Sequence, residues 1–290
     1  MFAQALLSAG LAAVASAQVD LEFTSQGQFS AHDAAFITVS KWSDSDEFLL
    51  GSAFGPSPIG HGSVYIIPNI KDAVKAGDVS TLAPVALDTG HTKFTWPNNV
   101  AAVPEDVFGN RSIVVPDGFL VPGHSNGGVY IVEMDAEDLT KVTSTTKITE
   151  KKSGYFYHMG HWVDLNGDGR KDFLTARSNA KKGGGELVWL EHPEEGVSNK
   201  KNKDAWTEHV IGNMADVGFE VVELPEYEGE IVVLAAQFFD EAVSMHRISL
   251  VDGSLIQSKI IDNTQIQSAY SVGLVDLNND GSRQLLVNNH

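Results

Sequence analysis

The sequence predicts an all-β protein, a β-propeller built from four-stranded blades. Three observations predict it. A short motif recurs at intervals of roughly sixty residues, β-branched and aromatic runs flank each copy, and turn residues separate the runs. The copies lie at 62–67, 127–132, 185–190 and, in weaker form, 242–248. A β-sandwich would also contain many short strands, but it would not repeat one strand order at this pitch.

Each unit is expected to contain four strands in a fixed order. A β-branched, aromatic-rich stretch comes first, an apolar run second, the recurring motif third and a polar alternating stretch fourth. The expected first strands are 35–39, 96–103, 161–164, 218–222 and 270–275, and the expected second strands are 48–53, 119–124, 173–177, 232–237 and 285–289. Brief helices are expected only at 72–76 and 136–139.

The number of blades stays open at this point. The chain holds about four and a half units and stops just after a second strand. Either five blades close, with residues 20–24 completing the last one, or the chain is part of a six- or seven-bladed ring and is incomplete at its C-terminus. The second alternative is favoured. Closure matters because an open blade exposes unpaired strand edges.

Composition excludes several classes of protein. The 290 residues include 20 Lys and Arg against 38 Asp and Glu, a formal net charge of −18, and no cysteine. Nucleic-acid binding and attachment to an anionic membrane both require basic patches. Without cysteine there is no disulfide, zinc ribbon or thiol nucleophile. Any chemistry therefore uses oxygen ligands, imidazoles or hydroxyls.

Residues 1–17 have the pattern of a secretory signal peptide. An apolar stretch closes on the small residues Ala15-Ser16-Ala17, and Gln18 begins a polar segment, although the n-region contains no Lys or Arg. We therefore expect a secreted protein whose propeller domain spans 18–290. No other run reaches the ~18 apolar residues that would cross a membrane. Asn110-Arg111-Ser112 is a sequon, so Asn110 is the expected glycosylation site.

A calcium loop is predicted between the first and second strands of the third unit. Its nine positions are Asp164-Leu-Asn166-Gly-Asp168-Gly-Arg170-Lys-Asp172, with oxygen side chains at positions 1, 3, 5 and 9 and the Arg170 carbonyl at position 7. Ca²⁺ takes about six to eight oxygen ligands and relieves the repulsion among crowded carboxylates. An EF-hand would have glutamate at position 12, where Thr175 stands, and flanking helices.

The fifth unit repeats this loop as Asp276-Leu-Asn278-Asn-Asp280-Gly-Ser282-Arg-Gln284. Gln284 offers a neutral amide oxygen at position 9, so weaker calcium binding is expected there. The corresponding acidic turns at 42–46 and 223–228 lack the Asn and Gly frame and are expected to be solvated turns.

These segments carry a family resemblance. Residues 48–54 and 62–67, together with the loop at 163–173, resemble the FG-GAP repeat of integrin α-subunit propellers and of related secreted VCBS-type propellers. The resemblance covers most of residues 30–290 and is most specific at the two Asp-x-Asn-x-Asp-Gly loops. It implies a propeller with calcium on the hairpins between first and second strands. Function stays open, because this fold serves adhesion receptors, lectins and some lyases.

Several histidines are expected at one rim of the propeller, where first strands start and second strands end. The residues expected there are His32, His91, Trp96, His158, His161, Tyr270, Ser52, His124, Arg177, Gln237, Asn289 and His290. His158 and His161 form the closest pair, since a local bulge would let residues three apart approach one metal. The candidate catalytic residues are therefore His91, His158, His161 and Arg177; the alternative is that such histidines only satisfy backbone groups.

Two functions remain, beside the possibility that the chain is a purely structural fragment of a larger receptor. The first is a secreted, calcium-binding module that recognises a glycan or an extracellular protein. The alternative is a propeller enzyme, a carbohydrate lyase or hydrolase, that uses a His-rich and metal-dependent site. Neither a nucleophile elbow nor a phosphate loop is present in the sequence.

Overall fold

The computed structural model describes residues 28–29, 34–42, 47–55, 60–119, 125–150, 154–179, 184–194 and 206–289. The expected signal peptide at 1–17 and the segment 20–24 lie outside these residues. The described chain contains four four-stranded antiparallel sheets, one two-stranded sheet and two short helices. The all-β class and the repeated four-stranded unit are therefore confirmed.

Consecutive strands form each sheet in chain order. The first sheet contains β1 (Ala34–Lys41), β2 (Glu47–Ala53), β3 (Ser63–Ile67) and β4 (Val85–Ala86), with helix α1 (Ile70–Ala76) before β4. The second contains β5 (Ala101–Val103), β6 (Ser112–Asp117), β7 (Gly128–Met134) and β8 (Val142–Lys147), with helix α2 (Glu105–Phe108) before β6. The third contains β9 (Tyr155–Val163), β10 (Asp172–Asn179), β11 (Gly185–Glu191) and β12 (Thr207–Gly212). The fourth contains β13 (Gly218–Val222), β14 (Glu230–Gln237), β15 (Ala242–Ser249) and β16 (Leu255–Asp262), and the fifth contains β17 (Ala269–Val275) and β18 (Gln284–Asn289).

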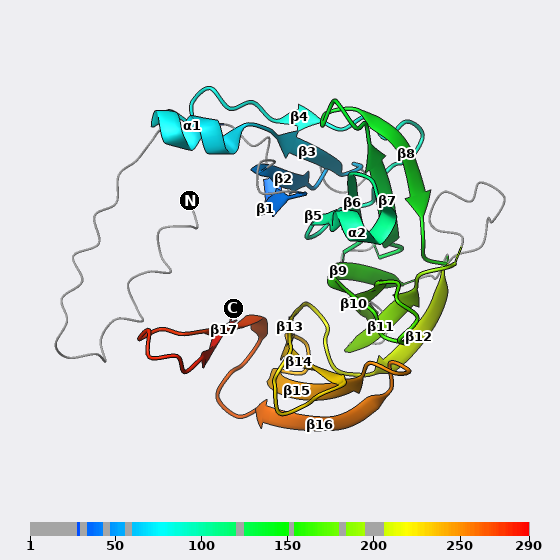
Figure 1. The fold of residues 1–290 in the computed structure, drawn as a ribbon, viewed down its shortest axis with the longest axis vertical. Helices are drawn as coiled ribbons and strands as arrows, with labels where there is room; N and C mark the ends of the chain where they lie inside the picture. The colour runs from blue at the N-terminus through cyan, green and yellow to red at the C-terminus, as the bar shows by residue number, and fades with distance from the viewer. Residues whose placement is uncertain are drawn as a thin grey trace.

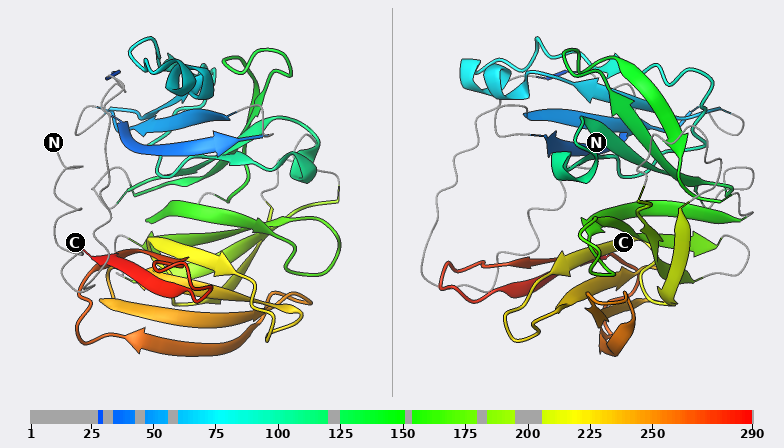
Figure 2. Two further views of the ribbon diagram at one scale, coloured as in Figure 1. Left: turned by 60° about the vertical axis from the view of Figure 1, so that its left-hand side comes forward. Right: turned by 45° about the vertical axis from the view of Figure 1, so that its right-hand side comes forward.

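The sheets follow one another around a common centre. In each sheet the first strand lies nearest that centre, and in the four-stranded sheets the fourth strand lies outermost (Figure 1). The turned views show neighbouring sheets packed face to face (Figure 2). The second strands β2, β10 and β14 are buried along almost their whole length, as their continuous apolar sequences predict.

The hydrophobic core is divided into layers between neighbouring sheets. One layer joins Phe48 and Ile66 of the first sheet to Ile113 and Val132 of the second. Equivalent layers lie between the second and third, third and fourth, and fourth and fifth sheets. The two middle strands of the first sheet, through Leu49 of β2 and Ile67 of β3, pack in another cluster with Ala73 of α1. Each sheet is therefore held mainly by its neighbours in sequence.

Aromatic residues reinforce the joints at one end of the innermost strands. Phe54, just after β2, stacks on Trp96 with ring centroids 4.8 Å apart. Phe119, just after β6, contacts Phe156 of β9 with centroids 6.4 Å apart. In both pairs the end of a second strand packs on the start of the next sheet. Such pairs contribute roughly 0.5–1.5 kcal/mol beyond their buried area.

The first strand of the second unit is shorter than the sequence predicts. It begins at Ala101 instead of residue 96. The Asp117 carboxylate accepts the N–H groups of Thr95 and Trp96 at 2.9 and 2.8 Å, and the Asn98 side chain donates to the Gly118 carbonyl at 2.7 Å. Strand pairing in this segment is limited to one antiparallel bridge, between Pro97 and Asp117, and the side-chain contacts hold the residues around it.

The helix expected at 136–139 is a turn. The Asp135 carboxylate accepts the N–H groups of Glu137 and Asp138, which competes with helix formation. Helix α2 was not expected, although Pro104 precedes it, Glu105 lies in its first turn and Gly109 caps it with φ of 68°. Among the described residues, no helix has the length and apolar character needed to span a bilayer.

Candidate functional site

The first Asp-rich loop, residues 164–172, joins β9 to β10 and is organised by its first carboxylate. Asp164 Oδ1 accepts the N–H groups of Gly167 and Asp168 at 2.8 and 3.2 Å, and Asp164 Oδ2 accepts that of Gly169 at 2.8 Å. Gly169 has a φ of 85°, which a side chain rarely tolerates. The aspartate spacing and the glycine therefore fix one tight loop.

The second Asp-rich loop, residues 276–284, joins β17 to β18 and reproduces this arrangement. Asp276 accepts the N–H groups of Asp280 at 3.1 Å and Gly281 at 2.8 Å. Gly281 has a φ of 86°, and Asn279 has a φ of 55°. The two loops therefore share one backbone conformation despite their different ninth residues.

The ninth residue of the first loop is the buried Asp172. Its two carboxylate oxygens accept the N–H groups of Leu165 at 2.9 Å and His192 at 2.8 Å. Burial raises the pKa of Asp172 to about 6, and these two amide bonds oppose the shift while the charges of Asp168 and Asp164 add to it. Asp172 thus links the loop to the end of β11.

The ninth residue of the second loop, Gln284, closes the loop with its own amide. Gln284 Oε1 accepts the N–H of Leu277 at 2.9 Å, as Asp172 does for Leu165. Its Nε2 donates to the Ser282 carbonyl at 2.9 Å. That carbonyl is at the seventh position, one of the oxygens expected to bind a cation, so in this loop a neutral side chain already satisfies it.

The donor set of the first loop fits a hard cation. Its side chains and carbonyls supply only oxygen ligands, the type that Ca²⁺ prefers. In the structure Arg170 forms an ion pair with Asp168 and donates from Nε to the His192 carbonyl at 3.2 Å. Across the described ranges, no group of three or more His, Cys, Asp or Glu side chains lies close enough to hold a metal. To bind a cation, the Asp168 carboxylate would therefore have to leave Arg170 and contact the metal instead.

His158 and His161 both lie in β9, which starts at Tyr155, so His161 is near its end and not at a strand start as expected. The register shifts between Tyr157 and Gly160, and this is the bulge that the sequence interpretation required. The two rings nevertheless contact different neighbours. His158 packs edge-on against Phe156 at 5.2 Å, whereas His161 packs against Phe219 of β13 at 5.0 Å.

His158 is 8% exposed, and burial lowers its pKa to about 4. It is therefore a neutral, packed side chain at neutral pH. His161 Nε2 lies 3.3 Å from the Phe219 carbonyl, and burial lowers the pKa of His161 against the opposing effect of Glu220. The shared site that the sequence analysis expected for these two histidines is not assembled.

Arg177 lies near the end of β10 as expected, but its side chain is only 3% exposed. Its guanidinium bonds Glu186 and Glu208, both at 2.7 Å, and stacks over Tyr155 at 4.3 Å. Burial by itself lowers the pKa of Arg177, but the contacts with Tyr157 and Glu208 outweigh it and raise that pKa. Arg177, which was expected at the rim, therefore forms a buried ion pair that stabilises the fold.

The other rim candidates that the structure describes do not form one cluster. His91 is exposed on the turn between β4 and β5. Tyr270 contacts Phe238 with ring centroids 6.5 Å apart, and Gln237 accepts the Ser244 hydroxyl hydrogen at 2.6 Å. Three further histidines lie outside the described residues: His32, His124 and His290.

Asn110 lies in the turn between α2 and β6 and is half-buried. Its Nδ2 donates to Glu133 Oε1 at 2.9 Å, and its Oδ1 accepts the Ser112 hydroxyl hydrogen at 2.7 Å. A glycan on Asn110 would therefore have to displace Glu133.

Sequence reasoning missed two buried carboxylates, each of which ties the segment before the first strand of a sheet to the end of the second strand of the same sheet. Asp117 bonds the segment before β5, as described above. Asp216, before β13, accepts the N–H groups of Phe238 at 2.7 Å and Phe239 at 2.8 Å, and burial raises its pKa to about 6. No local motif predicts the role of either aspartate, because the N–H groups of Trp96 and Phe238 that they bind lie more than 20 residues away in the sequence.

A buried Ser-His pair was also missed. Ser244 and His246 are two residues apart in β15 and therefore share one face of the strand. Ser244 Oγ lies 2.7 Å from His246 Nε2. His246 is 2% exposed, and its Nδ1 has no hydrogen-bond partner within the described part of the chain. Burial lowers the pKa of His246 to about 4. The imidazole therefore folds as the neutral form.

We expect acid to destabilise the protein through His246. Its folded pKa lies below the ordinary value of 6.5, so its stabilisation is present above pH 6.5 and is lost as the pH falls toward 4. The loss is on the order of 3 kcal/mol, at about 1.4 kcal/mol per pKa unit. Asp216 acts in the opposite direction, because its raised pKa favours the folded state as the pH falls through 6.

Urea unfolding of the wild type and of His246→Gln at pH 7 and pH 5 measures how much of the pH dependence of stability comes from His246. The variant should lose stability relative to the wild type at pH 7 and regain part or all of the difference at pH 5. An identical difference at both pH values would show that His246 does not titrate in this range.

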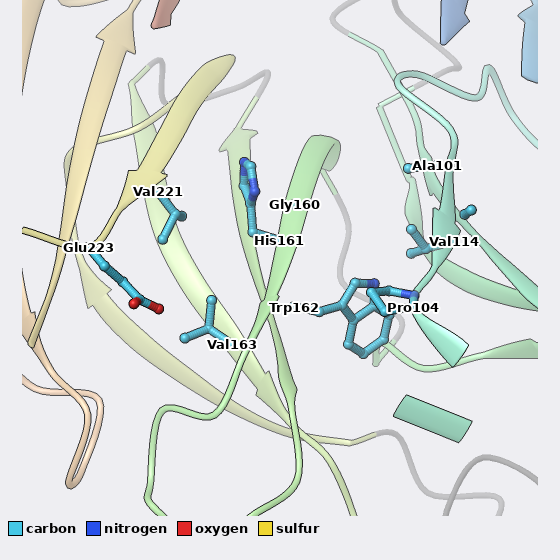
Figure 3. A pocket seen from close by; sticks show the side chains of 10 residues that line it. Ala101, Pro104, Val114, Gly160, His161, Trp162, Val163, Val221 and Glu223 are labelled. Atoms are coloured by element: carbon cyan, nitrogen blue, oxygen red, sulfur yellow. The ribbon is translucent and has the colours of Figure 1, made fainter. Parts of the chain in front are cut away.

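A pocket of about 420 Å³ opens where the innermost strands of three sheets end (Figure 3). It is lined by the end of β5, the end of β9 and the end of β13. The lining residues are Ala101, Ala102, Pro104, Val114, Gly160, His161, Trp162, Val163, Val221 and Glu223. Val163 directly precedes Asp164, so the pocket and the first Asp-rich loop lie on the same face.

Comparisons with known proteins do not identify a family for this chain. No family model and no curated protein matches the sequence. Among solved structures, a chain described as glucose dehydrogenase is similar at 11% identity, over 87% of this chain and 96% of that chain, with a TM-score of 0.27. A likeness this low carries no argument about fold or function.

Proposed function

We propose that this chain is a secreted β-propeller of the FG-GAP type, stabilised by calcium, that binds an extracellular glycan or protein. The observation that carries the proposal is that the first Asp-rich loop leaves β9 directly beside the pocket at the converging ends of β5, β9 and β13. A rigid set of sheets thus presents loops and a concave surface on one face, the arrangement in which binding sites are usually found.

The calcium part of the proposal assigns Asp164, Asn166, Asp168, Asp172 and the Arg170 carbonyl to the ion. Bound Ca²⁺ would neutralise carboxylates that now rely on amide hydrogen bonds and on Arg170. The second loop, with Asp276, Asn278, Asp280, Ser282 and Gln284, is proposed to bind more weakly, because Gln284 contributes no charge and occupies the Ser282 carbonyl.

Thermal melting tests the calcium part. At a free calcium concentration about 100 times its dissociation constant, binding to the native state adds about 2.7 kcal/mol. At roughly 2–4 °C per kcal/mol, EDTA should therefore lower the melting temperature of the wild type by about 5–10 °C. A melting temperature that EDTA leaves unchanged would remove calcium from the proposal.

Matched variants assign the effect to one loop. Asp164→Asn with Asp168→Asn should abolish the calcium-dependent shift, because it removes two carboxylates from the first loop. Asp276→Asn with Asp280→Asn makes the same change in the second loop and should keep most of the shift. The reverse ranking would contradict the role given to Gln284.

Expression in a eukaryotic secretory host tests the extracellular part. Intact mass should correspond to a chain beginning at Gln18, and a mass decrease on glycosidase treatment would report a glycan at Asn110. A glycan array and cross-linking to extracellular matrix proteins then test binding; a secreted, folded protein that binds neither would contradict the binding function.

A further inference from the structure

The pocket at the ends of β5, β9 and β13 differs from the opposite ends of the same strands. There, large aromatic rings fill the space between sheets, as in the Phe54 and Trp96 stack. At the pocket, Trp162 lines one side, and small residues, among them Ala101 and Gly160, leave the rest of the junction open (Figure 3). The cavity of about 420 Å³ is within the size range of small-ligand sites.

Two polar side chains of the pocket offer hydrogen-bond acceptors, and a third group, the Trp162 indole N–H, is a donor that is buried where the ring packs against Phe173 and Trp206. His161 is neutral, and its Nε2 lies 3.3 Å from the Phe219 carbonyl, so this nitrogen carries the hydrogen and Nδ1 is left as an acceptor. Glu223, exposed at the end of β13, adds a carboxylate. The remaining wall is largely aliphatic and includes Val163 and Val221.

This chemistry favours one class of ligand. Two acceptors beside an aliphatic wall suit a molecule with hydroxyl donors on its edge and C–H groups on its face. No Lys or Arg is among the pocket residues, and the chain has a net charge of −18, so an anionic ligand would be repelled. A single carboxylate without an aromatic cage gives little selectivity for a cation.

We propose that this pocket binds one neutral monosaccharide unit, with sugar hydroxyls donating to His161 Nδ1 and to Glu223 and the sugar face packing on Val163 and Val221. The inference rests on the proposed binding function and names the place and the class of its ligand. It is independent of whether calcium occupies the neighbouring loop.

Saturation-transfer NMR and titration with methyl glycosides of glucose, galactose and mannose test the proposal on the full chain. At least one glycoside should bind, with glucuronate binding at least tenfold more weakly than glucose. Val221→Trp should abolish binding by filling the pocket. Glu223→Gln and His161→Phe should each weaken it at least tenfold, and Glu226→Gln, in the same turn but outside the pocket, should leave it unchanged.

The outcomes separate the two proposals. Glycan binding on an array that survives Val221→Trp would keep the binding function and overturn the pocket assignment. Failure of every neutral methyl glycoside to bind would also overturn it, as would tighter binding of glucuronate than of glucose. If Val221→Trp does not fold, Glu223→Gln and its control Glu226→Gln still decide the question.

Discussion

Replacing Arg177 with alanine should destabilise the protein by about 3–5 kcal/mol, the usual loss when one partner of a buried ion pair is removed. The guanidinium is 3% exposed and bonds two carboxylates at 2.7 Å, those of Glu186 and Glu208. Glu208 is itself only 9% exposed. Alanine would remove the counter-charge from Glu208 in a poorly hydrated site, and it would expose the face of Tyr155 that Arg177 covers.

Arg247 provides a matched control with the same constellation near the surface. It bonds Glu230 through two nitrogens at 2.7 and 2.8 Å and lies 4.0 Å over the Tyr227 ring. Its side chain is 22% exposed, so water hydrates Glu230 after truncation. Arg247→Ala should therefore cost much less than Arg177→Ala, although the two contact sets look alike.

Urea denaturation of both variants measures this difference. A third variant, Arg177→Met with Glu186→Gln and Glu208→Gln, removes all three charges and should recover most of the lost stability, because the main cost is an unpaired buried charge. If Arg177→Ala and Arg247→Ala lost the same stability, burial would not be the reason for the effect.

The fold was predictable where its determinants are local. In the first, third and fourth units the second strands appear in the sequence as continuous apolar runs, and the recurring motif marks the third strand. In the second unit the prediction was wrong, because the second strand is Ser112–Asp117 and not 119–124. The prediction failed before β5, where the Asp117 side chain bonds the N–H groups of Thr95 and Trp96 across 21 or 22 residues. A contact between residues so far apart in the sequence produces no periodic pattern of residue types.

The candidate site divides in the same way. The two Asp-rich loops were predictable, because each is organised by bonds from its first aspartate to residues within the loop. The pocket was not, since its lining residues come from three sheets and carry no motif. His161 was placed at the wrong strand end because β9 begins at Tyr155, earlier than the sequence indicated.

Gly185→Ala should destabilise the protein by about 3 kcal/mol or more, at the upper end of the usual cost of overpacking. Gly185 begins β11, where the third sheet meets the fourth. A Cβ there would lie 2.1 Å from Asp216 Cβ and 2.6 Å from the Ala215 carbonyl oxygen. Backbone cannot rotate away as a flexible side chain can, so the two sheets would have to separate.

That separation would also break the polar joint between these sheets. Ser178, which pairs with Gly185 across the third sheet, donates its hydroxyl to the Asp216 carbonyl at 2.8 Å. Gly273→Ala in β17 is the matched control, because no atom of the described residues lies within 4 Å of its added Cβ, and it should cost almost nothing. Denaturant unfolding compares the two substitutions. Equal losses of stability in the two variants would mean that the backbone at Asp216 can move away without cost. The two sheets would then be held together by their apolar layers alone.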